Sequence, residues 1–299
     1  MSQRCIFCGR TERDFDGKNS WSNEHIIPES LGNSTLVIKN VCKQCNSCLG
    51  TYVDNYLVNH SLTKLYRQFL KLPSKKGVIP NAFREGVTED GTKIRLSRDF
   101  VPSVVPAATQ EGSGKLKIVA SSVDEARAIA KKKLERQNIP LEQINCLISK
   151  IDSSCLKTIR PDIQFDITLE TNRFLLESLK IGYEYATLKF GDAYLDDPTA
   201  VNIRKQLFRA ISGEMCRTCE KPPEANLFPL QKGQDLVGSP VIHALFIAST
   251  LDNKLIAYIF LFFGPIFSYQ VLLSLQADRY LENGECLCDF IESPSIRAI

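Results

Sequence analysis

The sequence predicts an α+β protein with a small zinc-stabilised N-terminal domain and a larger mixed α/β C-terminal domain. Three observations support this prediction. Two Cys-x-x-Cys pairs lie within the first 45 residues, and helical and alternating hydrophobic patterns are interspersed along the rest of the chain. Between these regions, residues 72–77 carry the Pro, Ser, Lys and Gly composition of a linker. We therefore expect one domain over residues 1–72 and another over residues 80–299.

Composition places the chain among folded, globular proteins. It has 299 residues, of which 43% are hydrophobic and 24% charged, so it can bury a core in each of two domains. No charged-then-apolar leader opens the sequence. The eleven cysteines occur as short-spaced pairs and scattered singles, which suits zinc binding in a reducing compartment rather than disulfides. We expect a cytoplasmic protein.

The four N-terminal cysteines have the spacing of a zinc site. Cys5 and Cys8 form one Cys-x-x-Cys knuckle, and Cys42 and Cys45 form a second one. Two such knuckles a few tens of residues apart are typical of tetrahedral zinc coordination. Four thiolates leave no position for water, so this zinc would be structural. The alternative is a set of ordinary buried thiols, which is what we expect of Cys48, a residue that fits no ligand position.

Polar residues near these knuckles suggest hydrolytic chemistry. Glu24 and His25 lie between the knuckles, and Asn46 follows the second knuckle directly. A neutral imidazole is the side chain best suited to take a proton from water near pH 7. Mg²⁺ or Mn²⁺ prefers oxygen ligands, such as a carboxylate and an amide. This combination suits phosphodiester hydrolysis, although a lone histidine can also be an ordinary loop residue.

The same residues resemble a known nuclease family. The motifs SNEHIIP at residues 22–28 and VCKQCN at residues 41–46 are together similar to the HNH endonucleases, also called the ββα-metal or His-Me finger family. The resemblance covers roughly residues 1–66. It implies a zinc-stabilised ββα-metal nuclease module that uses a catalytic divalent cation.

Residue roles follow from this resemblance. It implies that Glu24 is a ligand of the catalytic metal, that His25 is the general base, and that Asn46 holds the histidine loop against the metal loop. The third signature position, about nine residues beyond Asn46, falls on Asn55. Asp54 lies next to it, so either residue could be the second metal ligand.

Charge is unevenly distributed and favours a nucleic-acid partner. Residues 1–80 carry a net charge of +5 and the remainder −2, and a basic module is attracted to phosphate backbones. Chains that pair an HNH module with an unrelated second domain resemble bacterial restriction or anti-phage defence nucleases, so we expect DNA cleavage under the control of residues 80–299. The alternative is a catalytically silent zinc module that binds nucleic acid or a protein. The Glu24–His25 pair favours the enzyme, because a binding ribbon needs no acid beside an imidazole.

Hydrophobic periodicity predicts the elements in order. In the N-terminal domain a strand over 36–41 leads into helical spacing from Ser47 to Phe69. In the second domain, Ser122 and Glu125 form a capping box that begins a helix. The predicted elements of this domain are strands over 92–96, 115–120, 163–168, 241–250, 254–263 and 267–274, and helices over 122–137, 173–189 and 199–211.

Residues 255–277 are uncharged for 23 positions, which is long enough to span a membrane. Gly264 and Pro265 interrupt the run, and its aromatic and β-branched content favours strands. We therefore expect a buried hairpin and no membrane partner. Any exposed part of it would be a candidate surface for homo-oligomer assembly.

Two further C-terminal features could be functional or structural. The pair Cys216 and Cys219 could join Cys286 and Cys288 in a second zinc site, although the spacing between the pairs is loose and buried thiols are the default interpretation. His243 lies in an apolar, strand-like run and is expected to be a core or pocket residue.

Overall fold

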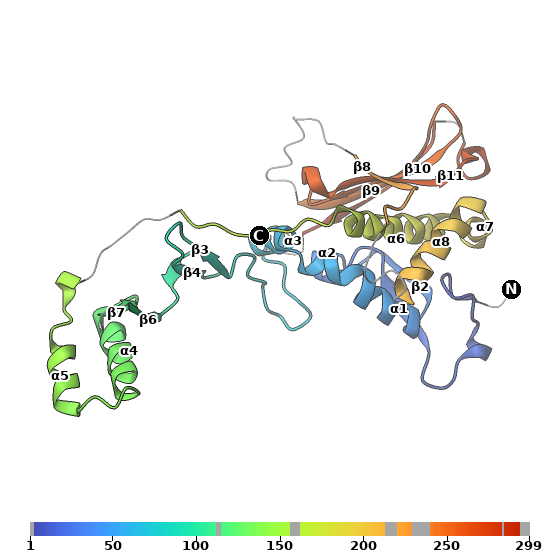
Figure 1. Cartoon of the computed structure of the whole chain (residues 1–299). Helices are drawn as coiled ribbons and strands as arrows, with labels where there is room; N and C mark the ends of the chain where they lie inside the picture. The colour runs from blue at the N-terminus through green and yellow to red at the C-terminus, as the bar shows by residue number, and fades with distance from the viewer. Residues whose placement is uncertain are drawn as a thin grey trace. The chain divides into compact units, whose positions relative to one another are not determined.

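The structure is a computed structural model in which the chain forms two compact units. One unit, here called the discontinuous unit, combines Met1–Pro80 with Leu169–Ile299; the other, the inserted unit, is Asn81–Thr168. This division differs from the boundary expected near residue 80, because the C-terminal part packs against the N-terminal module in one core. The described residues are 3–111, 115–155, 162–212, 220–228, 240–282 and 284–293 (Figure 1).

The discontinuous unit begins with the expected strand–strand–helix order. Strand β1 (Trp21–His25) pairs antiparallel with β2 (Val37–Cys42), and α1 (Lys43–Leu49) follows directly. The register of the pair shifts between Ser22 and Glu24, so β1 contains an irregularity just before its last two residues. The predicted α+β class and the ββα order are confirmed.

The helix after β2 is not regular throughout. A π-helical turn at Gly50–Asp54 separates α1 from α2 (Asn55–Asn59), and α3 (Ser61–Phe69) follows after His60, whose ring nitrogen accepts from Leu62 N. A π-turn inserts an extra residue into the helical repeat and is often found at functional sites.

The C-terminal part of the discontinuous unit contains a five-stranded antiparallel sheet with the order β12-β9-β10-β11-β8. The uncharged run 255–277 supplies the hairpin β10–β11, as predicted. Within the described ranges, no helix is both long and apolar enough to cross a membrane. The strands are β8 (Ala225–Leu227), β9 (Val241–Ser249), β10 (Leu255–Leu261), β11 (Ser268–Ser274) and β12 (Cys286–Glu292).

Helix α6 (Thr171–Phe190) joins the sheet to the N-terminal module. It lies between the sheet and the helices α1 and α2 in Figure 1, and it contacts β10 and β11 as well as α2. Every side chain from Phe174 to Thr187 is buried, which is expected of a helix covered on all sides. Gly182 allows the close approach to β11, since a Cβ there would lie 3.1 Å from the Val271 side chain.

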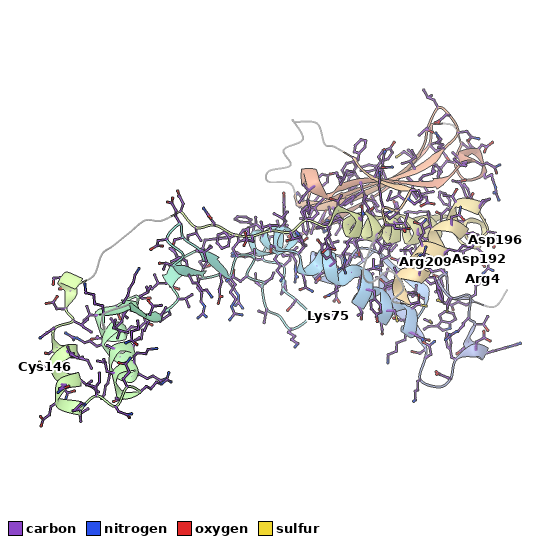
Figure 2. The ribbon with its side chains drawn as sticks, in the orientation of Figure 1. Arg4, Lys75, Cys146, Asp192, Asp196 and Arg209 are labelled. Atoms are coloured by element: carbon purple, nitrogen blue, oxygen red, sulfur yellow. The ribbon has the colours of Figure 1, made fainter. Side chains whose placement is uncertain are left out.

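Specific contacts connect α6 and its neighbours to the N-terminal module. The Tyr183 hydroxyl donates to the Ile6 carbonyl at 2.7 Å, and its ring lies 5.6 Å from that of Phe7. At the surface, Arg4 pairs with Asp196 at 3.4 Å (Figure 2), a contact that contributes little in water. Asp196 lies between α7 (Asp192–Leu195) and α8 (Pro198–Ile211).

The inserted unit is small and has few buried side chains. Its predicted strand over 163–168 is wrong: only Gln164 forms a bridge, to Val87, which ends a strand of three residues, and the pairing does not continue along the segment. The predicted helix after Ser122 is confirmed, and the Ser122 hydroxyl accepts a hydrogen bond from Glu125 N at its start. The elements are β3 (Glu85–Val87), β4 (Lys93–Leu96), β5 (Pro102–Val104), β6 (Ala107–Glu111), β7 (Lys115–Val119), α4 (Val123–Glu135) and α5 (Leu141–Ser149).

Candidate functional site

The two N-terminal knuckles bring four thiols together. The sulfur atoms of Cys5, Cys8, Cys42 and Cys45 all lie within 4.8 Å of one another, and those of Cys8 and Cys42 are 3.8 Å apart. Four sulfurs placed about 2.3 Å from a tetrahedral zinc would be about 3.8 Å apart. The donor set and its spacing therefore fit a metal ion such as zinc.

Local backbone structure positions these sulfurs. The first knuckle is a tight turn in which Gly9 N donates to Cys5 O at 2.8 Å, with Gly9 at a φ of +72°. Cys42 ends β2, and its amide donates to Cys5 Sγ at 3.4 Å. Hydrogen bonds from the Cys45 and Cys5 thiols lower the pKa of Cys8 to about 3, so this cluster favours a thiolate. Cys48 is half-buried and stands outside the cluster.

The possible second zinc site has only one half in the described part of the chain. Cys286 and Cys288 are exposed on β12. Cys216 and Cys219 lie outside the described residues. The second zinc therefore stays a prediction.

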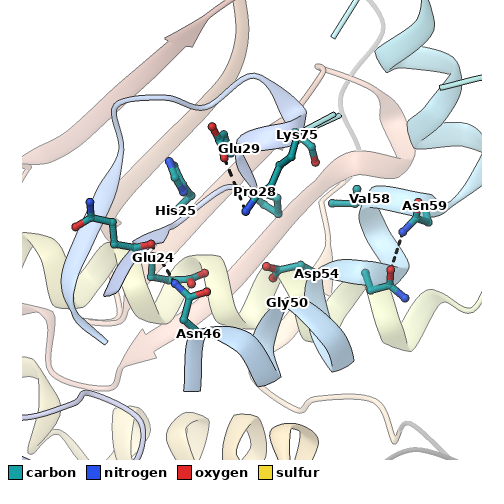
Figure 3. Close-up of a pocket in the computed structure, with 13 residues that line it drawn as sticks. Glu24, His25, Pro28, Glu29, Asn46, Gly50, Asp54, Val58, Asn59 and Lys75 are labelled. Carbon is teal, nitrogen blue, oxygen red and sulfur yellow. Dashed lines mark hydrogen bonds and ion pairs between the residues drawn. The ribbon is translucent and has the colours of Figure 1, made fainter. Parts of the chain in front are cut away.

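A pocket of about 290 Å³ opens beside α1, the helix that carries Cys45 (Figure 3). It collects side chains from the end of β1, from α1, from the π-helical turn and from α2. Every residue that the sequence predicts for the catalytic site lies in its wall. These residues are Glu24, His25, Asn46, Asp54 and Asn55.

Glu24 and His25 differ in burial. Glu24 is only 3% exposed, and burial raises the pKa of its carboxyl group while the ammonium of Lys180 opposes that rise. His25 is the last residue of β1 and is half-buried. Burial lowers the pKa of its imidazole, and the nearby carboxylate of Glu29 only partly offsets this. His25 is therefore neutral at pH 7 and can accept a proton.

Asn46 joins α1 to the strand that carries Glu24. Its amide nitrogen donates to Ser22 Oγ at 2.7 Å and to Asn23 O at 3.0 Å. These bonds lie at the irregularity in β1, where the register shifts. Because both acceptors precede Glu24 in β1, Asn46 fixes the position of this strand against the helix.

The two candidates for the second metal ligand are placed differently. Asp54 ends the π-helical turn, its side chain is 17% exposed, and it shares an ion-pair partner with Glu24. Asn55 is exposed, and its amide oxygen accepts a hydrogen bond from Asn59 at 2.6 Å. Figure 3 shows the Asp54 carboxylate pointing toward Glu24 across the pocket.

A buried lysine from α6 lies behind these carboxylates. Lys180 Nζ is 2.7 Å from Glu24 Oε1 and 3.0 Å from Asp54 Oδ1, and its side chain is fully buried. Burial alone would lower the pKa of Lys180, but the surrounding carboxylates, Asp54 foremost, raise it well above its ordinary value. The side chain is therefore an ammonium ion.

Two further acids surround this ammonium. Glu184 Oε2 is 3.7 Å from Lys180 Nζ, and Glu177 is fully buried on the same helix. Burial raises the pKa of both carboxyl groups well above its usual range. Sequence reasoning missed this cluster, although the spacing of Glu177, Lys180 and Glu184 within an apolar helix places all three on one face.

Comparison with protein-family models identifies the N-terminal part. Residues 5–62 match the model of a family described as HNH endonuclease. These residues form an HNH module. The match includes both thiol knuckles and ends before α6, so Lys180 lies outside the HNH module. Searches of curated proteins and of solved structures found no match to the chain.

Proposed function

We propose that the HNH module hydrolyses phosphodiester bonds in nucleic acid, with DNA as the favoured substrate and Mg²⁺ or Mn²⁺ as cofactor. The family match supports a nuclease-type function. The observation that carries the proposal is that Glu24, His25 and Asp54 line one pocket. An acid-and-imidazole pocket of this kind has a use in hydrolysis and none in a passive binding ribbon.

The wall of the pocket fits a hard divalent cation. Glu24 and Asp54 are oxygen donors, and each pairs with Lys180 through a named oxygen, Oε1 and Oδ1 respectively. We propose these two carboxylates as the metal ligands, with Asn55 as the other candidate for the second position. When bound, the cation would neutralise charge on the scissile phosphate and on the leaving oxygen.

His25 is proposed as the general base. Its neutral imidazole would take a proton from the attacking water, because burial keeps the ring unprotonated near pH 7. Asn46 would keep β1, and therefore His25, in position against α1. The thiol cluster would hold a structural zinc, since four thiolates leave no position for substrate or water.

Cleavage assays would test this function directly. Purified protein is incubated with supercoiled plasmid, single-stranded DNA or RNA in Mg²⁺, Mn²⁺ or EDTA. We expect metal-dependent cleavage that EDTA abolishes, and a loss of roughly 10²–10⁴-fold in His25→Ala. Ser30→Ala, which alters the wall of the same pocket, is the matched control and should cleave normally. Unchanged cleavage by a folded His25→Ala protein would refute the role of His25.

We also propose that this nuclease acts in bacterial restriction or anti-phage defence, with residues outside the HNH module controlling it. The support is the resemblance of this domain pairing to such nucleases. Phage should form fewer plaques on cells that express the wild-type chain than on cells that express His25→Ala. Equal plating across a broad phage panel would count against this role.

A further inference from the structure

Lys180 joins two carboxylates that come from different parts of the HNH module. Glu24 belongs to β1, whereas Asp54 belongs to the π-helical turn. One ammonium nitrogen contacts both, at 2.7 Å and 3.0 Å, and no other described basic side chain pairs with either carboxylate within 4 Å. The structure therefore places a single cation from α6 between two anions of the pocket wall.

The position of Lys180 is fixed on every side. Its side chain is fully buried, its helix is covered from Phe174 to Thr187, and its nitrogen also lies 3.4 Å from the His25 carbonyl oxygen. Glu184 contacts the same ammonium from one helical turn further along α6. Contacts with Glu24, Asp54 and the end of β1 therefore converge on one rigidly held group.

Two carboxylates in a buried site repel each other strongly unless a positive group lies between them. Without the ammonium, Glu24 and Asp54 would turn apart, and an incoming cation would have to bring its own ligands together. A group that orients metal ligands from behind typically affects metal affinity or activity by about 10–100-fold.

We propose that Lys180 is a positioning residue of the metal site: its ammonium holds Glu24 and Asp54 side by side so that their carboxylates can receive one divalent cation. This inference rests on the proposed function. It extends the catalytic site beyond residues 5–62, because the HNH module depends on a residue of α6 to arrange its ligands.

Whether removal of Lys180 strengthens or weakens cation binding distinguishes a positioning role from simple charge neutralisation. If Lys180 acted only as a nearby positive charge, its removal would strengthen cation binding, because repulsion between the ammonium and the cation would be lost. If it positions the ligands, its removal weakens cation binding. Mn²⁺ affinity therefore distinguishes the two roles independently of cleavage.

The experiment measures Mn²⁺ binding to the full chain by the electron paramagnetic resonance of free Mn²⁺, with zinc content and thermal melting followed in parallel. We expect Lys180→Met to weaken Mn²⁺ binding at least about tenfold and to retain its zinc. Glu184→Gln is the matched control, since the amide oxygen that replaces the Glu184 carboxylate can still accept from Lys180 Nζ, and Glu184 does not line the pocket. It should bind Mn²⁺ within about twofold of wild type.

A double variant controls for misfolding that Lys180→Met could cause by leaving the Glu184 carboxylate buried without its ammonium partner. Lys180→Met with Glu184→Gln removes one charged group and one of its buried partners together, and it should show the same weakening as the single variant. Equal or tighter Mn²⁺ binding in a folded Lys180→Met or double-variant protein would overturn the inference while leaving the proposed function intact. A wild-type protein that neither binds Mn²⁺ nor cleaves nucleic acid would overturn both.

Discussion

The Nε2 atom of His243 lies 2.8 Å from the carbonyl oxygen of Leu31, and this contact joins strand β9 of the sheet to a turn of the HNH module. The other ring nitrogen, Nδ1, accepts a hydrogen bond from Phe262 N at 3.2 Å. The ring is therefore a neutral tautomer with Nε2 donating to Leu31. It is fully buried, as expected for a core residue.

We predict that His243 makes stability depend on pH. Burial lowers the pKa of His243 to about 4, whereas the unfolded value is about 6.5. Its contribution is therefore present above about pH 6.5 and is lost progressively as the pH falls from there to the folded-state value near 4, because the unfolded chain binds the proton first. The loss is on the order of 3 kcal/mol of unfolding free energy.

Urea unfolding at pH 7.5 and pH 5 would measure this effect. The comparison is between wild type and His243→Gln, whose amide can still donate to Leu31 O. Other titrating groups are shared by both proteins, so the difference isolates His243. An identical pH dependence in the two proteins would contradict the prediction.

A second prediction concerns the thiol cluster. Cys42→Ser should remove the metal and destabilise the HNH module, because structural zinc contributes folding free energy directly. Elemental analysis should find one zinc in wild type and none in Cys42→Ser. Cys48→Ser, which changes a thiol outside the cluster, should retain its zinc. Two zinc ions per chain would instead support the pairing of Cys216 and Cys219 with Cys286 and Cys288.

A third prediction decides between Asp54 and Asn55. Asp54→Asn should raise the Mg²⁺ concentration needed for half-maximal cleavage by at least about tenfold, because it removes a charged ligand. Asn55→Ala should have a much smaller effect, since the Asn55 amide oxygen is engaged by Asn59. A Mg²⁺ requirement that changes only in Asn55→Ala would assign the ligand to Asn55 instead.

A fourth prediction concerns the two units. Replacing residues 81–168 by a flexible Gly/Ser linker should leave the discontinuous unit folded, because Met1–Pro80 and Leu169–Ile299 share one core. The isolated fragment 1–80 should bind Mn²⁺ more weakly, because it lacks both Lys180 and the core that it shares with Leu169–Ile299. Zinc content, melting and Mn²⁺ binding of both proteins test this. Wild-type Mn²⁺ affinity in fragment 1–80 would refute it.

Local patterns in the sequence account for much of this structure. The Cys-x-x-Cys spacing predicted the thiol cluster, and periodicity predicted α4, α6, α8 and the hairpin β10–β11. Glu24 and His25 stood out as candidate site residues because an acid beside an imidazole between two knuckles has a chemical use, and both line the pocket.

The remaining features depend on contacts between distant residues. The approach of Lys180 to Glu24 and Asp54 has no local signature, because it arises only when α6 packs on the HNH module. The failed strand at Gln164 shows the same limit, since alternation cannot supply a partner strand. The π-helical turn before Asn55 could not be predicted either, because a periodicity analysis assumes one constant helical repeat.

The ribosome synthesises the two segments of the discontinuous unit, Met1–Pro80 and Leu169–Ile299, at different times. Glu24 and Asp54 emerge early, and Lys180 follows only after residues 81–168 have been translated, a delay on the order of 5–20 s. The inserted unit is a compact, continuous segment, so it can fold in this interval. The α6-facing surface of the nascent HNH module therefore stays uncovered at first, and Lys180 reaches Glu24 and Asp54 only after α6 leaves the exit tunnel.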